Sequence, residues 1–186
     1  MVKSDLPLVV LGLGSNKGDS RKIILDAMDV LKSVLSDLRA ASLYETEPLH
    51  VTDQKSFINT AVAGFFSGEN KLNVPKKAEA EIGLRQEFTL LCLLLHTINR
   101  IEAQFGRDRA KERRWGERFL DIDILLFGDF VINEEGLQIP HPRLKERQFA
   151  LQPLLELLPD AADPITRISY KNICDALGAQ GVKKLS

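Results

Sequence analysis

Residues 119–129 read FLDIDILLFGD, an apolar stretch rich in isoleucine and leucine that predicts a buried β-strand. Asp121 and Asp123 interrupt this stretch with one isoleucine between them. Side chains two apart on a strand point to the same side, so both carboxylates belong to one face, whereas Ile122 and Ile124 face the core. Two neighbouring like charges repel, and neither is buried cheaply without a cation. The stretch predicts either a divalent-cation site or a solvated strand face.

The segments around this strand predict an alternation of strands and helices. The order β-α-β-β-α-β predicts an α+β protein with a ferredoxin-like βαββαβ core: a mostly antiparallel sheet with helices packed on it, then a small hairpin and C-terminal helices. Residues 67–86 have no clear period and predict an insertion loop. His96, inside an apolar helix, is predicted to be a packed core residue. The predicted strands are 7–13, 40–48, 56–66 and 119–129, the helices 20–38, 86–106, 147–159 and 169–178, and the hairpin 130–140.

The composition is that of an ordinary globular protein. With 186 residues, 44% hydrophobic and 27% charged, the chain predicts a single domain over residues 1–186. A net charge of −1 gives no bulk attraction to nucleic acid or membrane. The two cysteines, Cys92 and Cys174, form neither a zinc pattern nor a disulfide framework. The start is a poor signal peptide, and no apolar run is long enough to span a bilayer, so we expect a cytoplasmic protein.

A basic segment, residues 107–118, stands directly before the two aspartates and reads RDRAKERRWGER. Arginines beside acidic metal ligands are the pattern expected for a nucleoside triphosphate. The acids hold the metal, the metal bridges phosphates, and the arginines neutralise the remaining charge. Two other interpretations stay open: a solvated charge run, and a nucleic-acid patch, for which Trp115 and Phe119 supply few aromatic rings.

Two further motifs have weaker signals. The stretch LGLGSNKGD (11–19) is rich in glycine, but its spacing fits neither a dinucleotide fingerprint nor a P-loop, which favours a tight strand-to-helix turn. His141 lies between two prolines, with Arg143 and Arg147 nearby. A lone histidine is usually structural, yet this one could contact a phosphate.

Six motifs occur along the chain: LGLGSN (11–16), YETEP (44–48), FINTAV (57–62), RIEAQFGR (100–107), RWGERFLDIDILLFG (114–128) and IPHPRLKERQFALQPLLEL (139–157). Taken together, these motifs resemble the 6-hydroxymethyl-7,8-dihydropterin pyrophosphokinase family. The resemblance runs from about residue 8 to about residue 160. It implies a ferredoxin-like fold and an ATP- and Mg²⁺-dependent diphosphotransferase. Such an enzyme moves the β,γ-pyrophosphoryl group of ATP to the hydroxymethyl group of the reduced pterin and releases AMP, a step of folate biosynthesis.

The resemblance also implies roles for individual residues. Asp121 and Asp123 would hold two Mg²⁺ ions against the triphosphate, and with Arg107 and Arg118 they would form the catalytic set. Contacts to ATP would come from Glu102, Arg107, Arg109, Arg118, His141 and Arg147.

For the pterin, the resemblance implies two rings, Phe57 and Phe149, that sandwich the flat heterocycle. Asn59 would read its hydrogen-bonding edge, Thr46 and Leu49 would offer backbone groups to that edge, and Trp115 would close over the site.

Some relatives are fused to dihydropteroate synthase, so the resemblance also implies that this domain could belong to, or associate with, a longer folate-pathway protein. Two alternative functions stay open. An RNA-binding ferredoxin-like module would need RNP-like aromatics, which the sequence lacks. A catalytically inactive relative would have lost an aspartate or Arg118, and all three are retained.

Overall fold

The computed structural model describes residues 6–48, 53–68, 86–108, 116–134 and 136–185. The sheet strands are β1 (Leu8–Ser15), β2 (Ser36–Ala40), β3 (Tyr44–Thr46), β4 (Phe57–Phe65), β5 (Asp121–Phe127) and β8 (Lys183–Lys184), and β6 (Ile132–Glu134) and β7 (Leu137–Ile139) form a hairpin. The helices are α1 (Ser20–Leu31), α2 (Gln86–Gln104), α3 (Gln148–Leu157) and α4 (Tyr170–Ala176), with a short 3-10 helix at Leu144–Glu146.

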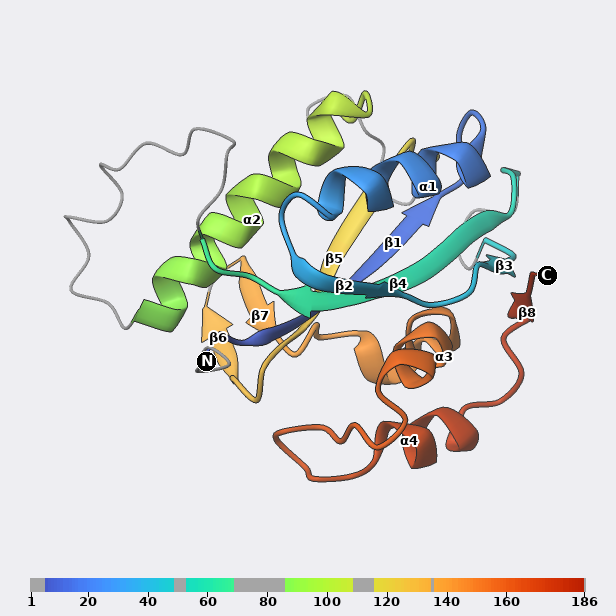
Figure 1. Cartoon of the computed structure of the whole chain (residues 1–186). Coiled ribbons are helices and arrows are strands. Elements are labelled where there is room, and N and C mark those ends of the chain that lie inside the picture. Colours follow the sequence, from blue (N-terminus) through green and yellow to red (C-terminus); the bar gives the residue numbers. More distant parts are fainter. Residues whose placement is uncertain (1–5, 49–52, 69–85, 109–115, 135, 186) are drawn as a thin grey trace.

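One six-stranded sheet organises the molecule (Figure 1). Its order is β5-β1-β4-β3-β8, and β2 pairs with the other half of β4, so β2 and β3 together form one interrupted strand. The described strand pairs of this sheet are antiparallel. This order confirms the predicted ferredoxin-like core, and β6 and β7 confirm the predicted hairpin.

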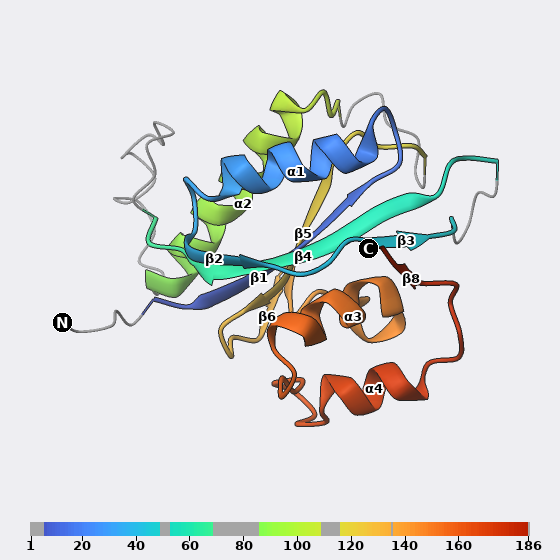
Figure 2. The same cartoon turned by 45° about the vertical axis from the view of Figure 1, so that its right-hand side comes forward.

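Helices cover both faces of the sheet: α1 and α2 lie on one face, α3 and α4 on the other (Figure 2). The alternation of side chains along each strand divides the core into two clusters. Ile122 and Ile124 join the α1/α2 cluster, as predicted, whereas Leu125 joins the α3/α4 cluster. Asp121 and Asp123 therefore lie on the α3 face of β5.

The predicted helix 20–38 is wrong at its C-terminal end. The helix stops at Leu31, and Ser36–Ala40 is strand β2. Val34 and Leu35 are buried in the core although they lie outside the helix. Their spacing matches the apolar face of a helix that continues past Leu31, which explains the wrong prediction. Asp37 has a φ of 51°, which no regular helix contains.

Two further features differ from expectation. His96 is exposed, because it lies on the outer side of α2 whereas Leu94 and Ile98 face the core. Strand β8 was not predicted. In the described part of the chain, no helix is both long enough and apolar enough to cross a bilayer. The predicted insertion, 67–86, falls almost wholly outside the described residues.

Candidate functional site

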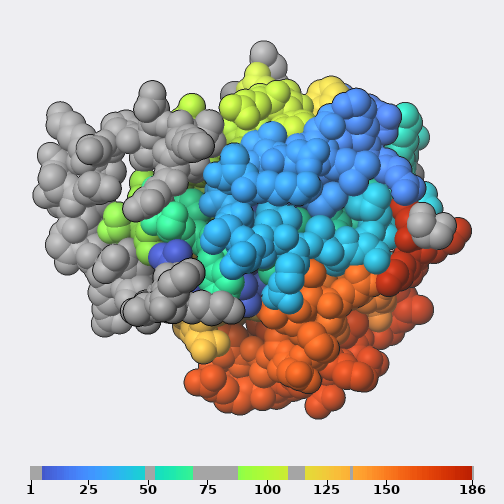
Figure 3. All heavy atoms as spheres, in the orientation of Figure 1, coloured from blue at the N-terminus to red at the C-terminus, as the bar shows by residue number. Residues whose placement is uncertain are grey.

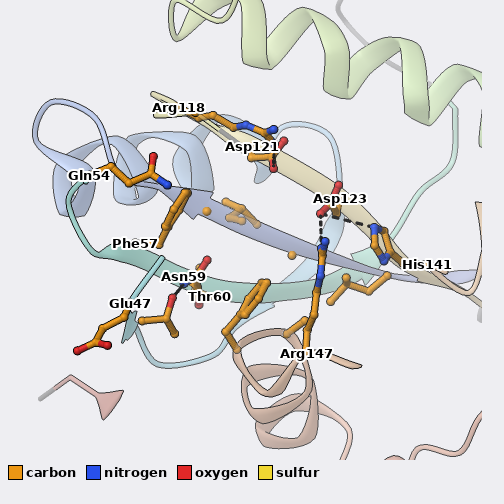
Figure 4. Close-up of a pocket in the computed structure, with 18 residues that line it drawn as sticks. Glu47, Gln54, Phe57, Asn59, Thr60, Arg118, Asp121, Asp123, His141 and Arg147 are labelled. Atoms are coloured by element: carbon orange, nitrogen blue, oxygen red, sulfur yellow. Dashed lines mark hydrogen bonds and ion pairs between the residues drawn. The ribbon is translucent and has the colours of Figure 1, made fainter. Parts of the chain in front are cut away.

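A cleft opens on the α3 face of the sheet, between the strands and the start of α3 (Figure 4). Strand β1 forms its floor with Gly12 and Gly14. A Cβ on Gly14 would lie 3.0 Å from Oδ1 of Asn59, so the glycine leaves room for that amide. Gly12 lies in a strand, as predicted, and Gly14 also belongs to that strand and not to the predicted turn. Gly18 lies in the turn, with a φ of 74°.

The structure brings most of the predicted site residues into this one cleft. Leu49, Arg109 and Trp115 lie outside the described residues. Glu102 and Arg107 lie behind Asp121 and not among the described lining residues. The predicted residues that line the cleft are Thr46, Phe57, Asn59, Arg118, Asp121, Asp123, His141, Arg147 and Phe149.

At one end of the cleft, Asp121 is shared by two arginines. Its Oδ1 lies 2.6 Å from a terminal nitrogen of Arg107, and its Oδ2 lies 2.6 Å from one of Arg118. The same nitrogen of Arg107 contacts Glu102, which is fully buried and accepts a 2.8 Å hydrogen bond from the backbone N–H of Ile122. Glu102 thus anchors both Arg107 and the start of β5.

Asp123, two residues further along β5, lies farther from positively charged side chains than Asp121 does. Its Oδ2 lies 3.8 Å from Nε2 of His141 and 3.9 Å from Arg147 (Figure 4). Desolvation, reinforced by the charge of Asp121, raises the pKa of Asp123 to about 6, although Arg147 acts in the opposite direction. Desolvation and Arg147 lower the pKa of His141 to about 4, so the imidazole is neutral at neutral pH. Arg147, at 3.9 Å, is therefore the nearest positive charge to Asp123 among the described residues, and it is more distant than the two arginines that contact Asp121.

The two carboxylates fit a hard cation such as Mg²⁺. They share one strand face, they repel each other, and their oxygens are the ligands that Mg²⁺ prefers. Within the described residues, no cluster of three or more acidic, histidine or cysteine side chains could hold a metal. Mg²⁺ commonly takes one or two carboxylates and completes its shell with water and substrate phosphates, so a pair is sufficient beside a triphosphate.

The other end of the cleft combines aromatic rings with a fixed amide. Asn59 is buried, and its Nδ2 donates a 2.7 Å hydrogen bond to Oγ1 of Thr46 on the neighbouring strand β3. That bond sets the orientation of the amide. Phe57 lines the cleft from β4, and Phe149 lines it from α3. The guanidinium of Arg147 lies 5.5 Å from the centre of the Phe149 ring and so joins the two ends.

Asn16 is a residue whose part in the site was not predicted. It is fully buried, and its Oδ1 accepts a 2.8 Å hydrogen bond from the backbone N–H of Arg118. Its Nδ2 donates to Oε1 of Gln54 and to the backbone oxygen of Lys55, both at 3.3 Å. Asn16 therefore ties together three segments that border the cleft. The sequence signal that could have identified Asn16 is its position, a polar residue directly after a buried strand.

Fold and site define a ferredoxin-like protein with a two-part cleft, one part suited to a metal-bound polyphosphate and the other to a flat heterocycle. The chain belongs to the 7,8-dihydro-6-hydroxymethylpterin-pyrophosphokinase family, whose model matches residues 10–89 and 87–159.

Curated relatives agree with this assignment. The chain is 38% identical over 164 residues to the 2-amino-4-hydroxy-6-hydroxymethyldihydropteridine pyrophosphokinase of Aquifex aeolicus, covering 88% of each chain. It is 37% identical over 163 residues to the mitochondrial folate synthesis bifunctional protein of Pisum sativum, covering 87% of this chain and 27% of that protein. The chain thus spans about a quarter of the length of the pea protein.

The fold is also found in solved structures. A wild-type Plasmodium falciparum HPPK-DHPS structure superposes with a TM-score of 0.63 at 15% identity, covering 94% of this chain and 41% of that chain. At this identity the likeness shows the fold alone.

Proposed function

We propose that this protein transfers the β,γ-pyrophosphoryl group of ATP to 6-hydroxymethyl-7,8-dihydropterin, giving AMP and the pterin diphosphate in folate biosynthesis. The observation that carries the proposal is the two-part cleft. Asp121, Asp123 and Arg118 stand at one end of it, and Asn59 with two phenylalanines stands at the other. Family membership and the pyrophosphokinase name of the Aquifex relative support it.

The phosphate end would hold the triphosphate. Asp121 and Asp123 would hold two Mg²⁺ ions, which when bound neutralise phosphate charge and orient the transferred group. Arg107 and Arg118 would stabilise the negative charge that shifts during transfer, because arginine binds phosphate oxygens in two-pronged geometry. Glu102 would keep Arg107 in place, and His141 and Arg147 would contact ATP.

The pterin end would place the nucleophile. Phe57 and Phe149 would stack on the two faces of the ring, and Asn59, held by Thr46, would bond to its edge. The hydroxymethyl oxygen then attacks the β-phosphorus and gives up its proton to solvent, the bond from that phosphorus to the α-phosphate oxygen breaks, and AMP leaves. Positioning and charge stabilisation account for most of the catalysis in such transfers.

The neighbours of this domain are part of the proposal. The pea relative is named bifunctional, so we propose that this domain is fused to, or associates with, a second folate-pathway enzyme, dihydropteroate synthase. We propose a single domain and a cytoplasmic location; the name of the pea relative places that protein in mitochondria.

The RNA-binding alternative is not favoured, because helices cover both faces of the sheet.

The test is product analysis. The purified chain is mixed with Mg²⁺, ATP and the hydroxymethyl dihydropterin, and nucleotides are separated by chromatography. We expect AMP and a pterin diphosphate in equal amounts, with no AMP when pterin is omitted. Formation of ADP, or no consumption of ATP, would contradict the proposal.

A further inference from the structure

Residues 178–185, here called the C-terminal strap, run alongside β3 and the start of α3 (Figure 2). In the space-filling view the red C-terminal atoms lie against the cyan atoms of the segment that contains β3 (Figure 3). Both elements carry residues of the pterin end: Thr46 belongs to β3, and Phe149 to the first turn of α3. The strap therefore touches the two sides of one subsite without lining it.

The first anchor of the strap is Gln180 at the start of α3. The first turn of any helix has backbone N–H groups without helical partners. Within the described chain the N-cap residue, Arg147, does not cap α3 with its own side chain. Instead the N–H of Gln148 donates a 2.9 Å bond to Oε1 of Gln180, and Nε2 of Gln180 donates a 2.9 Å bond to the backbone oxygen of Glu146. Gln180 thus caps the helix from a distant part of the chain.

The second anchor is at β3, which is three residues long. Strand β8 pairs with it, Tyr44 opposite Lys184, and the N–H of Leu185 donates a 2.8 Å bond to the backbone oxygen of Leu43. A strand this short holds few ladder bonds to β4, so the second partner restricts it substantially.

Glu156, on α3, connects the second anchor to that helix. Its carboxylate contacts the ammonium of Lys184, accepts a 2.7 Å hydrogen bond from the N–H of Ser42, and accepts a 2.8 Å bond from the Tyr44 hydroxyl. The first two donors come from the strap and from the chain just before β3. One carboxylate therefore fixes α3, β3 and the strap relative to one another.

We propose that Gln180, Lys184 and Glu156 are positioning residues for the pterin subsite, because they hold Phe149 and Thr46 at the separation that the flat ring needs. The inference rests on the proposed function. A subsite ordered before the ligand arrives avoids the entropy cost of ordering its side chains on binding, so loosening it should weaken binding without removing any contact to the ligand.

The two anchors give different expected results. Lys184→Met loosens β3, so it should raise the dissociation constant of the pterin about threefold to tenfold and leave that of MgATP unchanged. Gln180→Ala loosens the first turn of α3, which carries Arg147 as well as Phe149, so both ligands should bind about threefold to tenfold more weakly. Calorimetry measures each constant, the pterin being titrated into protein saturated with a non-hydrolysable MgATP analogue.

Conservative variants and a matched control separate positioning from general destabilisation. Lys184→Arg keeps the cation and should bind both ligands like the wild type. Gln180→Glu keeps the accepting oxygen for the N–H of Gln148 but loses the donor to Glu146, so its dissociation constants should lie between those of the wild type and Gln180→Ala. Lys171→Met breaks an exposed 2.6 Å ion pair with Asp175 on α4 and should change neither constant. Hydrogen exchange at the amides of Gln148 and Leu185 should accelerate in Gln180→Ala and Lys184→Met respectively.

The outcomes distinguish this inference from the proposed function. If the wild-type protein forms AMP but the strap variants bind pterin normally, the inference is wrong and the function stands. Equal weakening of both ligands by Lys184→Met, or a matching loss in Lys171→Met, would also overturn it. If the wild type forms no AMP, the proposed function is wrong, and unchanged amide exchange in the variants would then separately refute the anchors.

Discussion

Asp121 and Asp123 are two residues apart on one strand, yet their surroundings differ. Asp121 is bonded at 2.6 Å by each of two arginines, whereas Asp123 has the neutral imidazole of His141 at 3.8 Å and the guanidinium of Arg147 at 3.9 Å. The metal-free protein therefore compensates one carboxylate and leaves the other close to a like charge. The two residues share a chemical role in the proposed reaction but differ in what they contribute to stability.

We expect Asp121→Asn and Asp123→Asn each to abolish AMP formation, with opposite effects on folding. Asp121→Asn should destabilise the protein by about 1–3 kcal/mol, because Arg107 and Arg118 each lose a 2.6 Å contact to a carboxylate, although Arg107 keeps its contact to Glu102. Asp123→Asn should leave stability unchanged or raise it, because it removes a repulsion. Thermal unfolding in EDTA measures the stability of each variant. The control is Asp129→Asn, at an exposed position after β5. Unfolding of Asp123→Asn would indicate a structural role.

Gly14 allows a second residue-level prediction. In Gly14→Ala the added methyl group would lie 3.0 Å from Oδ1 of Asn59, whose amide is held by Thr46 and cannot move freely. Pterin binding should weaken about tenfold or more, because small displacements of positioned groups are costly, while MgATP binding persists. Gly12→Ala is the control, since its methyl group would meet the flexible side chain of Leu125. Equal effects of both substitutions on pterin binding would contradict the prediction.

At the scale of elements, β3 depends on contacts outside its own pairing with β4. Burial raises the pKa of Glu156, but Lys184, the N–H of Ser42 and the hydroxyl of Tyr44 outweigh it and lower the pKa to about 2. Burial, together with the hydrogen bond to Glu156, raises the pKa of the Tyr44 hydroxyl. The ionised carboxylate is thus part of the attachment between α3 and β3.

This lowered pKa predicts a pH-dependent loss of stability. The ordinary pKa of the group is 4.5, so its stabilising contribution is complete above pH 4.5 and is lost as the pH falls toward 2. Wild type should exceed Glu156→Gln in stability at pH 6, and the difference should shrink through that window. Denaturant unfolding at several pH values measures the difference, and Asp175→Asn, in an exposed pair, should show almost none. A constant gap between wild type and Glu156→Gln would refute this.

At the scale of the whole molecule, the cleft is assembled from segments far apart in the sequence. Strand β5 and the segment before it supply the end with Asp121, Asp123 and Arg118, β3 and β4 supply the opposite end, and α3 closes one side. Asn16 holds three bordering segments together, and the strap holds β3 to α3. A substitution that removes one of these contacts should therefore affect the whole cleft and not a single residue of it.

Asn16→Ala tests this coupling. The substitution leaves the N–H of Arg118 without its 2.8 Å acceptor and removes two bonds to residues 54 and 55. We expect a loss of about 1–3 kcal/mol in stability and a marked fall in turnover, because Arg118 is no longer fixed beside Asp121. Asn133→Ala, which removes an exposed 2.7 Å bond in the β6–β7 hairpin, is the control and should change neither quantity. Full turnover in Asn16→Ala would show that Arg118 needs no such support.

Much of this organisation could be predicted from local patterns. The period of two in β5 placed Asp121 and Asp123 on one face. The order of predicted strands and helices gave the ferredoxin-like core, and the family resemblance gave most of the lining residues. The end of α1 could not be predicted, because Val34 and Leu35 keep helical spacing while packing from a loop. Strand β8 could not either, since two exposed lysines carry no apolar period and pair only because β3 presents a free edge.

The sequence by itself determined the alternation of elements, the face on which the carboxylates lie, and the residue types of both ends of the cleft. The alternation and the face follow from interactions between near neighbours, which periodicity records. The residue types at the two ends of the cleft follow from the family resemblance of the motifs. The tertiary structure alone decided that Arg107 pairs with Asp121 through a buried Glu102, that Asn16 supports Arg118, and that Gln180 and Lys184 brace α3 and β3. Such contacts join residues far apart in the chain, and only the packing of the sheet and helices brings them within hydrogen-bonding distance.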